Sequence, residues 1–252
     1  MQDTIIILCG KRNPSIIAGN IYKKLLGPSY QLLFIEERRK KEETLQFFKN
    51  YLKKRGLLRT LDVICFRIYF ILISIFKKTT ESLLIKEYVP DLIVSNVNEK
   101  KVLKLVEKYS PKYIITNGCW ILNEHTLNHI SCPIINLHMG IAPRYRGSGN
   151  IYAFYENNFK MVGVTIHYVD KGIDTGKPIS IIPIDIKKDN FPMKDIALVS
   201  FEKGAHAIVE FILKNTKEIP DAFRNLASHY YPLPGLTHYL QARRNYKNYI
   251  NK

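Results

Sequence analysis

Short apolar runs that alternate with helical segments limit most strongly what this chain can fold into. The runs lie at residues 4–10, 30–35, 91–94, 113–116 and 133–138, and each predicts a buried strand. Strands that alternate with helices are typical of a parallel sheet that is covered on both faces. The sequence therefore predicts an α/β fold, a Rossmann-like and mostly parallel sheet with helices on both faces.

Helix signals fill the intervals between these runs. Ser15 is expected to cap a helix after the first run, and Asn98 is expected to cap another helix that stops before Pro111. Residues 196–213 predict one further helix. We expect residues 1–190 to form the main, catalytic domain and residues 191–252 to form a small C-terminal appendage of helix and loops.

A helical insertion at about residues 37–79 interrupts the alternation. Its first part has mixed charge and predicts a solvated helix, whereas residues 57–76 are strongly apolar apart from three charged side chains. The uninterrupted apolar run at 68–76 is much shorter than the roughly 20 residues of a membrane span. Burial against the sheet or in a subunit interface is the favoured interpretation. A helix that lies on a membrane surface and a lid over the substrate are the alternatives.

Composition adds limits on size, compartment and partners. The chain has 252 residues, of which 46% are hydrophobic, enough for one sizeable core. Four cysteines without metal-ligand spacing, and no signal peptide, favour reduced thiols in a cytoplasmic protein. The net charge of +16 attracts phosphate groups on a nucleotide, a nucleic acid or an acidic membrane. The basic, tyrosine-rich tail is expected to be a solvated helix rather than a nucleic-acid contact.

Chemistry is concentrated in Asn136-Leu137-His138 and in Asp174, which belongs to the segment 163–176. Asn136 and His138 are two residues apart at a predicted strand end, so both side chains project to the same face, where ligands of parallel sheets bind. An amide, an imidazole and a carboxylate suit the attack of an amine on a carbonyl carbon. The amide and imidazole stabilise the oxyanion, and the carboxylate orients a protonated His138 and helps to relay a proton.

The stretch from Ile134 to Ile179 resembles the core of the folate-dependent formyltransferases, which include glycinamide ribonucleotide, methionyl-tRNA and sugar-nucleotide N-formyltransferases. The motifs that carry the resemblance are Asn136-Leu-His138, Pro143, Tyr145-Arg146-Gly147, Gly163-Val-Thr-Ile-His167 and Asp174-Thr-Gly176. One departure is Met139-Gly-Ile-Ala-Pro143, where the family usually has Ser-Leu-Leu-Pro after the histidine and one small residue or proline. It affects the expected acceptor side and leaves the three chemical residues intact.

The resemblance implies roles for individual residues. Asn136, His138 and Asp174 would be catalytic, and N10-formyltetrahydrofolate would be the formyl donor, without a metal. The donor would contact Gly118, Cys119, Trp120, Ile121, Leu122, Val169, Asp170, Gly172 and Ile173. The acceptor would contact Lys11, Arg12, Arg144, Tyr145, Arg146 and Gly147. Arg144 and Arg146 could equally pair with local carboxylates, Trp120 could fill the core, and His167 is expected to be structural.

The favoured acceptor is a nucleotide-linked amino sugar, whose phosphates suit a basic protein. Methionyl-tRNA is the first alternative, although proteins that formylate it carry a sizeable C-terminal barrel and only about 60 residues follow the core here. Glycinamide ribonucleotide is the second, although the insertion is not expected there. A nucleic-acid-binding or membrane-bound protein on an inactive scaffold is the alternative outside the enzyme class. A homodimer is compatible with the sequence.

Overall fold

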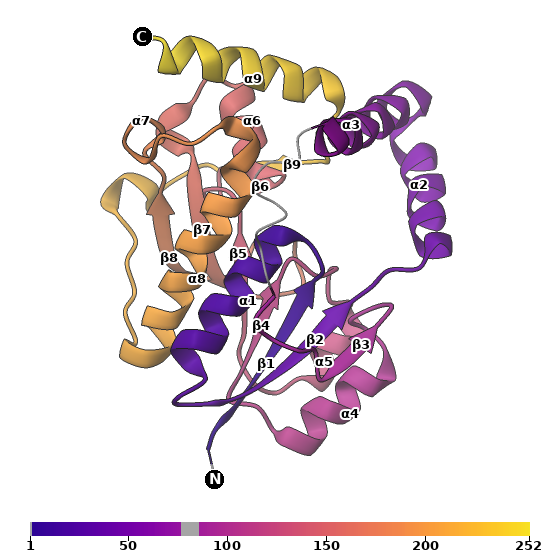
Figure 1. The fold of residues 1–252 in the computed structure, drawn as a ribbon, viewed down its shortest axis with the longest axis vertical. Coiled ribbons are helices and arrows are strands. Elements are labelled where there is room, and N and C mark those ends of the chain that lie inside the picture. The colour runs from indigo at the N-terminus through magenta and orange to yellow at the C-terminus, as the bar shows by residue number, and fades with distance from the viewer. Residues whose placement is uncertain (1, 77–85) are drawn as a thin grey trace.

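A seven-stranded sheet forms the centre of the computed structural model, which describes residues 2–76 and 86–252 (Figure 1). The strands are β1 (Thr4–Gly10), β2 (Gln31–Glu37), β3 (Leu92–Val94), β4 (Tyr113–Asn117), β5 (Ile134–His138), β6 (Arg146–Gly147), β7 (Gly163–Tyr168), β8 (Pro178–Pro183) and β9 (Tyr230–Tyr231). The large sheet has the order β3-β2-β1-β4-β5-β7-β8, and β6 pairs with β9 separately. The first five strands are parallel, while β7 and β8 are antiparallel to their neighbours.

The predicted fold class is confirmed, and β1 to β5 are the five apolar runs of the sequence. The helices are α1 (Asn13–Leu26), α2 (Lys41–Arg55), α3 (Leu57–Phe76), α4 (Lys100–Tyr109), α5 (Glu124–His129), α6 (Gly149–Tyr155), α7 (Ile186–Asp189), α8 (Ile196–Lys214) and α9 (Leu236–Ile250). Short 3-10 turns lie at Phe159–Met161, Met193–Asp195 and Asp221–Phe223. The predicted helix at 196–213 is α8.

The two faces of the sheet are covered by different helices. Ile5 and Ile7 of β1 belong to a core cluster that includes residues of α1 and α8, whereas Ile6 and Leu8 belong to a second cluster with α4. This alternation follows from the strand geometry, in which successive side chains project to opposite faces. All seven residues of β1 are buried, which explains the continuous apolar run in the sequence.

Both predicted helix caps were wrong by one to three residues. The N-cap of α1 is Arg12, so that Ser15 lies inside the helix and is buried. The N-cap of α4 is Glu99, and the Asn98 amide instead donates to the Ile121 carbonyl. Neither N-cap side chain makes a capping hydrogen bond, and Glu99 accepts from backbone groups upstream of the helix.

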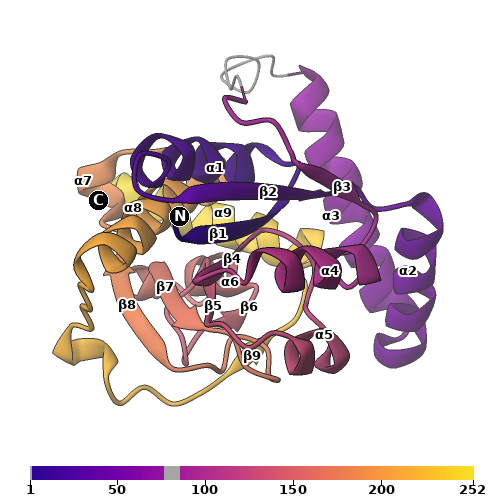
Figure 2. The same cartoon turned by 90° about the horizontal axis from the view of Figure 1, so that it is seen from below.

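The insertion is helical at residues 41–55 and 57–76, as expected, but these helices do not lie on the sheet, and residues 77–79 are outside the described residues. In the two views, α2 and α3 stand beside the sheet, and α3 contacts α9 and α2 (Figures 1 and 2). Burial of residues 57–76 against the sheet, the first half of the favoured interpretation, was therefore wrong, while burial in a subunit interface stays a prediction. Within the described ranges, no helix is long and apolar enough to cross a membrane.

Helix α8 packs on α1 and on strands β5, β7 and β8, so it covers the sheet. Helix α9 packs on α6 and α3 instead, with Tyr239, Ala242 and Tyr246 buried. The division of the chain at residue 190 stays a prediction.

Candidate active site

Asn136 and His138 lie at the carboxyl end of β5, the last of the parallel strands. Antiparallel pairing with β7 places Asn136 opposite His167 and His138 opposite Thr165. Asp174 lies in the loop after β7 and has a φ of 51°, a left-handed conformation that is uncommon for residues other than glycine. The fold thus brings the carboxylate from a loop to side chains that are held by a buried sheet.

The three predicted catalytic side chains meet around the Asp174 carboxylate. Its Oδ2 atom lies 3.2 Å from His138 Nδ1 and accepts a hydrogen bond from the Gly147 backbone at 2.8 Å. Its Oδ1 atom accepts from Asn136 Nδ2 at 3.3 Å. The structure therefore brings Asn136 and His138 into contact with one carboxylate, that of Asp174, as the sequence predicts.

The second ring nitrogen of His138 is also occupied. His138 Nε2 lies 2.6 Å from the Tyr145 carbonyl oxygen, and since a carbonyl only accepts, this nitrogen carries the proton. Gly140 permits the contact, because a Cβ atom there would come within 2.5 Å of the Tyr145 oxygen and 2.7 Å of His138 Nε2. The glycine of the unusual Met139–Pro143 segment thus has a direct structural role at the imidazole.

Burial and charge act in opposite directions on this cluster. Burial lowers the pKa of His138 below its ordinary value of 6.5, and the nearby Asp174 carboxylate only partly opposes this effect. Burial would raise the pKa of Asp174, but His138, His167 and the Gly147 N–H hold it at about 2. The carboxylate is therefore ionised at neutral pH. Burial favours a neutral His138 ring, whereas the acceptor atoms at both ring nitrogens, the Asp174 carboxylate and the Tyr145 carbonyl, favour a protonated one.

Two further residues complete the hydrogen-bond network. The Asn136 amide donates to His167 Nε2 at 3.0 Å, and His167 Nδ1 donates to the Tyr168 carbonyl at 2.8 Å. The Thr116 hydroxyl donates to Asn136 Oδ1 at 2.7 Å and so fixes the orientation of the amide. Sequence reasoning missed Thr116, although its position at the end of the strand beside β5 was a usable signal.

The predicted acceptor contacts have different environments. Arg146 donates to the Ile173 carbonyl at 3.1 Å, and Gly147 contacts Asp174, so both lie at the cluster. The Tyr145 side chain is buried and donates to Glu156, which also pairs with Arg144 at 3.3 Å. Only the backbone of Tyr145 therefore reaches the cluster, and the Arg144 guanidinium pairs with a local carboxylate.

Lys11 and Arg12 are exposed at the carboxyl end of β1, where Arg12 precedes α1. Across residues 2–76 and 86–252, no ion pair joins either side chain to Asp174. Their assignment to the acceptor stays a prediction. A search of the same ranges finds no group of acidic, cysteine and histidine side chains that could hold a metal ion.

The predicted donor contacts form two loops that flank β5. Residues 118–122 follow β4, where Gly118 has a φ of 72°, Trp120 lies under the Arg39 guanidinium at 4.1 Å, and Ile121 is exposed. Residues 169–173 follow β7, and the Val169 N–H donates to the Ile134 carbonyl. The Trp120 ring also contacts the Phe47 ring of α2, so Trp120 connects its loop to the insertion.

Apolar and cationic groups lie together at the first of these loops, where Arg39, from the segment after β2, also pairs with Glu37 at 3.1 Å. These groups offer exposed apolar surface at Ile121 and a cation at Arg39 beside the indole of Trp120. Aromatic rings pack against apolar side chains and carboxylates pair with guanidinium groups. The function of the two loops in donor binding stays a prediction.

Comparison with known proteins identifies the central part of the chain. Residues 76–197 match the family model described as formyl transferase. A methionyl-tRNA formyltransferase of Finegoldia magna is 33% identical over 97 residues, which are 38% of this chain and 30% of that protein. The bifunctional polymyxin resistance protein ArnA of Wigglesworthia glossinidia brevipalpis is 28% identical over 188 residues, 70% of this chain and 28% of that protein.

Among solved structures, a sugar N-formyltransferase from Shewanella sp FDAARGOS_354 has the same fold. Its TM-score is 0.55 at 13% identity, and the match covers 97% of this chain and 87% of that one. The chain spans only about a third of the length of the two curated relatives named above.

Proposed function

We propose, on the premise that residues 76–197 match the formyl transferase family model, that the protein is a folate-dependent N-formyltransferase. The donor is N10-formyltetrahydrofolate, and the acceptor is the amine of a nucleotide-linked amino sugar. The observation that carries the proposal is the contact of Asn136, His138 and Asp174 at the end of β5.

In the proposed reaction the neutral acceptor amine attacks the formyl carbon. A new C–N bond forms, an oxyanion develops, and the bond between the formyl carbon and the donor nitrogen then breaks. One proton leaves the attacking amine and one reaches the departing nitrogen, so the proton count is unchanged. The Asn136 amide and the Nε2–H of His138 are suited to donate to the oxyanion, which the Nε2–H reaches by exchanging its present partner, the Tyr145 carbonyl.

Asp174 has two parts in this proposal. Its carboxylate lies 3.2 Å from His138 Nδ1, so it orients the ring and favours a second proton there. The carboxylate thus supports a protonated ring against the effect of burial, and it helps to relay the proton that leaves the attacking amine. Thr116 and His167 are positioning residues, because they hold the Asn136 amide.

A nucleotide-linked amino sugar is supported by three observations, each of them general. The Shewanella structure with the same fold is a sugar N-formyltransferase, and that match covers most of both chains. The net charge of +16 attracts a nucleotide diphosphate. Arg146 lies at the cluster, where a guanidinium suits phosphate recognition.

Methionyl-tRNA is the second candidate acceptor. It is favoured by the Finegoldia relative, which is 33% identical over its matched part and is a methionyl-tRNA formyltransferase. The same net charge would attract a nucleic acid, so charge does not discriminate between the two acceptors.

An acceptor panel with N10-formyltetrahydrofolate tests the proposal. It compares amino-sugar nucleotides that differ in base and amine position, glycinamide ribonucleotide and charged initiator tRNA, and formylation is measured by mass spectrometry. We expect formylation of at least one amino-sugar nucleotide and its loss in the His138→Gln variant. Formylation of tRNA alone would overturn the acceptor while keeping the chemistry, and no formylation of any acceptor would overturn both.

A further inference from the structure

Helix α3 has an unusual distribution of side chains, with its charges toward the protein and leucines toward solvent. Its three charged residues are Arg59, Asp62 and Arg67. Arg59 and Asp62 are largely covered, and the Arg67 guanidinium lies over the ring of Phe48 at 4.7 Å. Polar side chains on a solvated helix normally occupy the exposed face. This inversion calls for a physical explanation.

The inward charges attach α3 to the rest of the molecule. Arg59 contacts Asp62 at 3.1 Å, donates to the Tyr152 hydroxyl at 2.9 Å and donates to the Leu233 carbonyl at 2.7 Å. Asp62 accepts from the backbone and hydroxyl of Thr237 at 3.0 and 2.7 Å. These contacts fix which face of α3 is directed outward.

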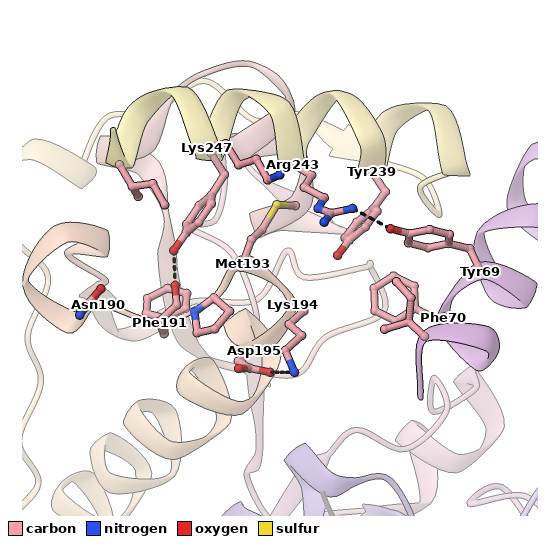
Figure 3. Close-up of a pocket in the computed structure, with 14 residues that line it drawn as sticks. Tyr69, Phe70, Asn190, Phe191, Met193, Lys194, Asp195, Tyr239, Arg243 and Lys247 are labelled. Atoms are coloured by element: carbon pink, nitrogen blue, oxygen red, sulfur yellow. Dashed lines mark hydrogen bonds and ion pairs between the residues drawn. The ribbon is translucent and has the colours of Figure 1, made fainter. Parts of the chain in front are cut away.

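Aromatic packing on α9 fixes the same orientation further along the helix. Figure 3 shows Tyr69 and Phe70 directed toward Tyr239 and Arg243 of α9, around a cavity of about 560 Å³. The Phe70 ring lies 4.9 Å from the Tyr239 ring, and Arg243 donates to the Tyr69 hydroxyl at 3.0 Å. None of the catalytic trio lines this cavity.

The opposite side of the helix is an exposed apolar stripe, here called the outer face of α3. It comprises Leu58, Leu61, Cys65, Ile68 and Leu72, which recur every three or four residues. The exposed fractions are 84% for Leu58, 47% for Leu61, 51% for Ile68 and 48% for Leu72. A stripe of this kind is typical of a helix face that is covered by another molecule or by lipid.

A basic run lies directly beside one end of the outer face. Lys53, Lys54 and Arg55 form the last turn of α2, and all three are exposed. The acidic residues of α2, Glu42 and Glu43, are in its first turn, away from α3. Leu52 and Leu57 on either side of the run are exposed as well, at 40% and 61%. Cations interleaved with exposed leucines suit the boundary between acyl chains and anionic headgroups.

We propose that the outer face of α3 and the basic run of α2 bind the surface of an anionic lipid bilayer. The helix would lie in the interface, since within the described residues none is long and apolar enough to cross a membrane. An anionic bilayer supplies both the hydrocarbon and the negative charge that this surface lacks. A second copy of the chain would instead bring another net charge of +16 toward it.

Vesicle co-sedimentation of the full chain tests this inference without any formyl acceptor or donor. Vesicles of phosphatidylcholine alone are compared with vesicles that contain roughly 30 to 40% phosphatidylglycerol, at low and at high salt. We expect binding to the anionic vesicles that weakens with salt. The triple variant Leu58→Gln, Leu61→Gln, Leu72→Gln is expected to bind at least about tenfold more weakly, because it removes the inserted side chains.

A matched variant separates this surface from general hydrophobicity. Val89, Leu213 and Ile250 are exposed by 82%, 45% and 44%, close to the values of the three leucines, and their replacement by Gln is expected to leave binding unchanged. Replacement of Lys53, Lys54 and Arg55 by Gln should remove the preference for anionic vesicles. The same replacement of Lys100, Lys104 and Lys108 on α4 by Gln should leave the preference for anionic vesicles unchanged.

Three outcomes would overturn the inference. The first is no binding to either kind of vesicle. The second is an equal loss of binding in the α3 variant and in its matched control. The third is a wild-type dimer that the α3 variant converts to a monomer in light scattering, without vesicle binding, since that would make the outer face a subunit interface.

Discussion

His138 has acceptor atoms on both sides of its ring, the Tyr145 carbonyl and the Asp174 carboxylate. Asn136 is equally occupied, by Thr116, His167 and Asp174. Each group that acts on a substrate must therefore exchange an internal partner for a reacting atom. Buried polar groups that are fully paired hold their geometry well, and here they preserve the arrangement in the absence of substrate.

Substitution within the trio is expected to separate activity from stability. His138→Gln and Asp174→Asn should each lower turnover by about 10² to 10⁴-fold, because each removes a proton-transfer or orienting group while keeping a similar volume. Initial rates and thermal unfolding check this expectation, with His206→Gln on the exposed side of α8 as the control. Near-normal rates in both trio variants would rule out the proposed roles.

The pH dependence of the rate distinguishes a neutral from a protonated His138. Because burial lowers the pKa of His138 below 6.5, the active neutral ring is present at neutral pH and is lost as the pH falls through that lowered pKa. The measured quantity is kcat/KM of the wild type divided by kcat/KM of His138→Gln at each pH. Titration of the acceptor amine affects both enzymes equally and therefore cancels in this ratio. We expect this ratio to be constant above pH 6.5 and to fall below it; a ratio that declines above pH 7 would require the protonated ring.

The identity of the three chemical residues was predictable from sequence, but their protonation and support were not. Asn136 and His138 share a face because of strand periodicity, and the glycine-flanked turn directed attention to Asp174. The contact between His138 and the Tyr145 carbonyl depends on the path of the loop at residues 139–145, which no local pattern specifies. The pKa of His138 follows from that burial and was therefore inaccessible.

At the scale of elements, the insertion is held by a partly buried ion pair of α3 together with aromatic packing against α9. The apolar run at 57–76 favoured burial in the sequence analysis, because an apolar helix usually faces the core. The structure instead directs the charged residues of α3 inward. There Arg59 contacts His238 of α9, the Tyr152 hydroxyl and the Leu233 carbonyl. Those partners are distant in sequence, so no local pattern could reveal the inversion.

Loss of Arg59 is expected to weaken the attachment of α3. Arg59→Met should lower the free energy of unfolding by about 1 to 3 kcal/mol, since it leaves partly buried partners unpaired. The matched control is Arg224→Met, which breaks an ion pair with Asp221 at the same sequence spacing but on the exposed surface, and it should have little effect. Urea denaturation measures both, and equal effects would contradict the role of Arg59.

At the scale of the whole molecule, the parallel half of the sheet was predictable and the antiparallel edge was not. Five apolar runs define β1 to β5, whereas β7 was noticed for its motif and β8 was not predicted as a strand. Helix α8 was predicted within one residue at its C-terminal end but was assigned to an appendage. Its contacts with α1 and three strands are long-range, and periodicity gives the length of a helix rather than its neighbour.

The attachment of α3 to α9 has a consequence for synthesis of the chain. The partners of Arg59 lie 93 to 179 residues further along the sequence, and α9 comes last among the described elements. A nascent chain on the ribosome must carry an undocked, leucine-rich helix until residues 236–250 have emerged. During that interval both sides of α3 are open to chaperones and to aggregation, so protection of one early helix depends on the latest part of translation.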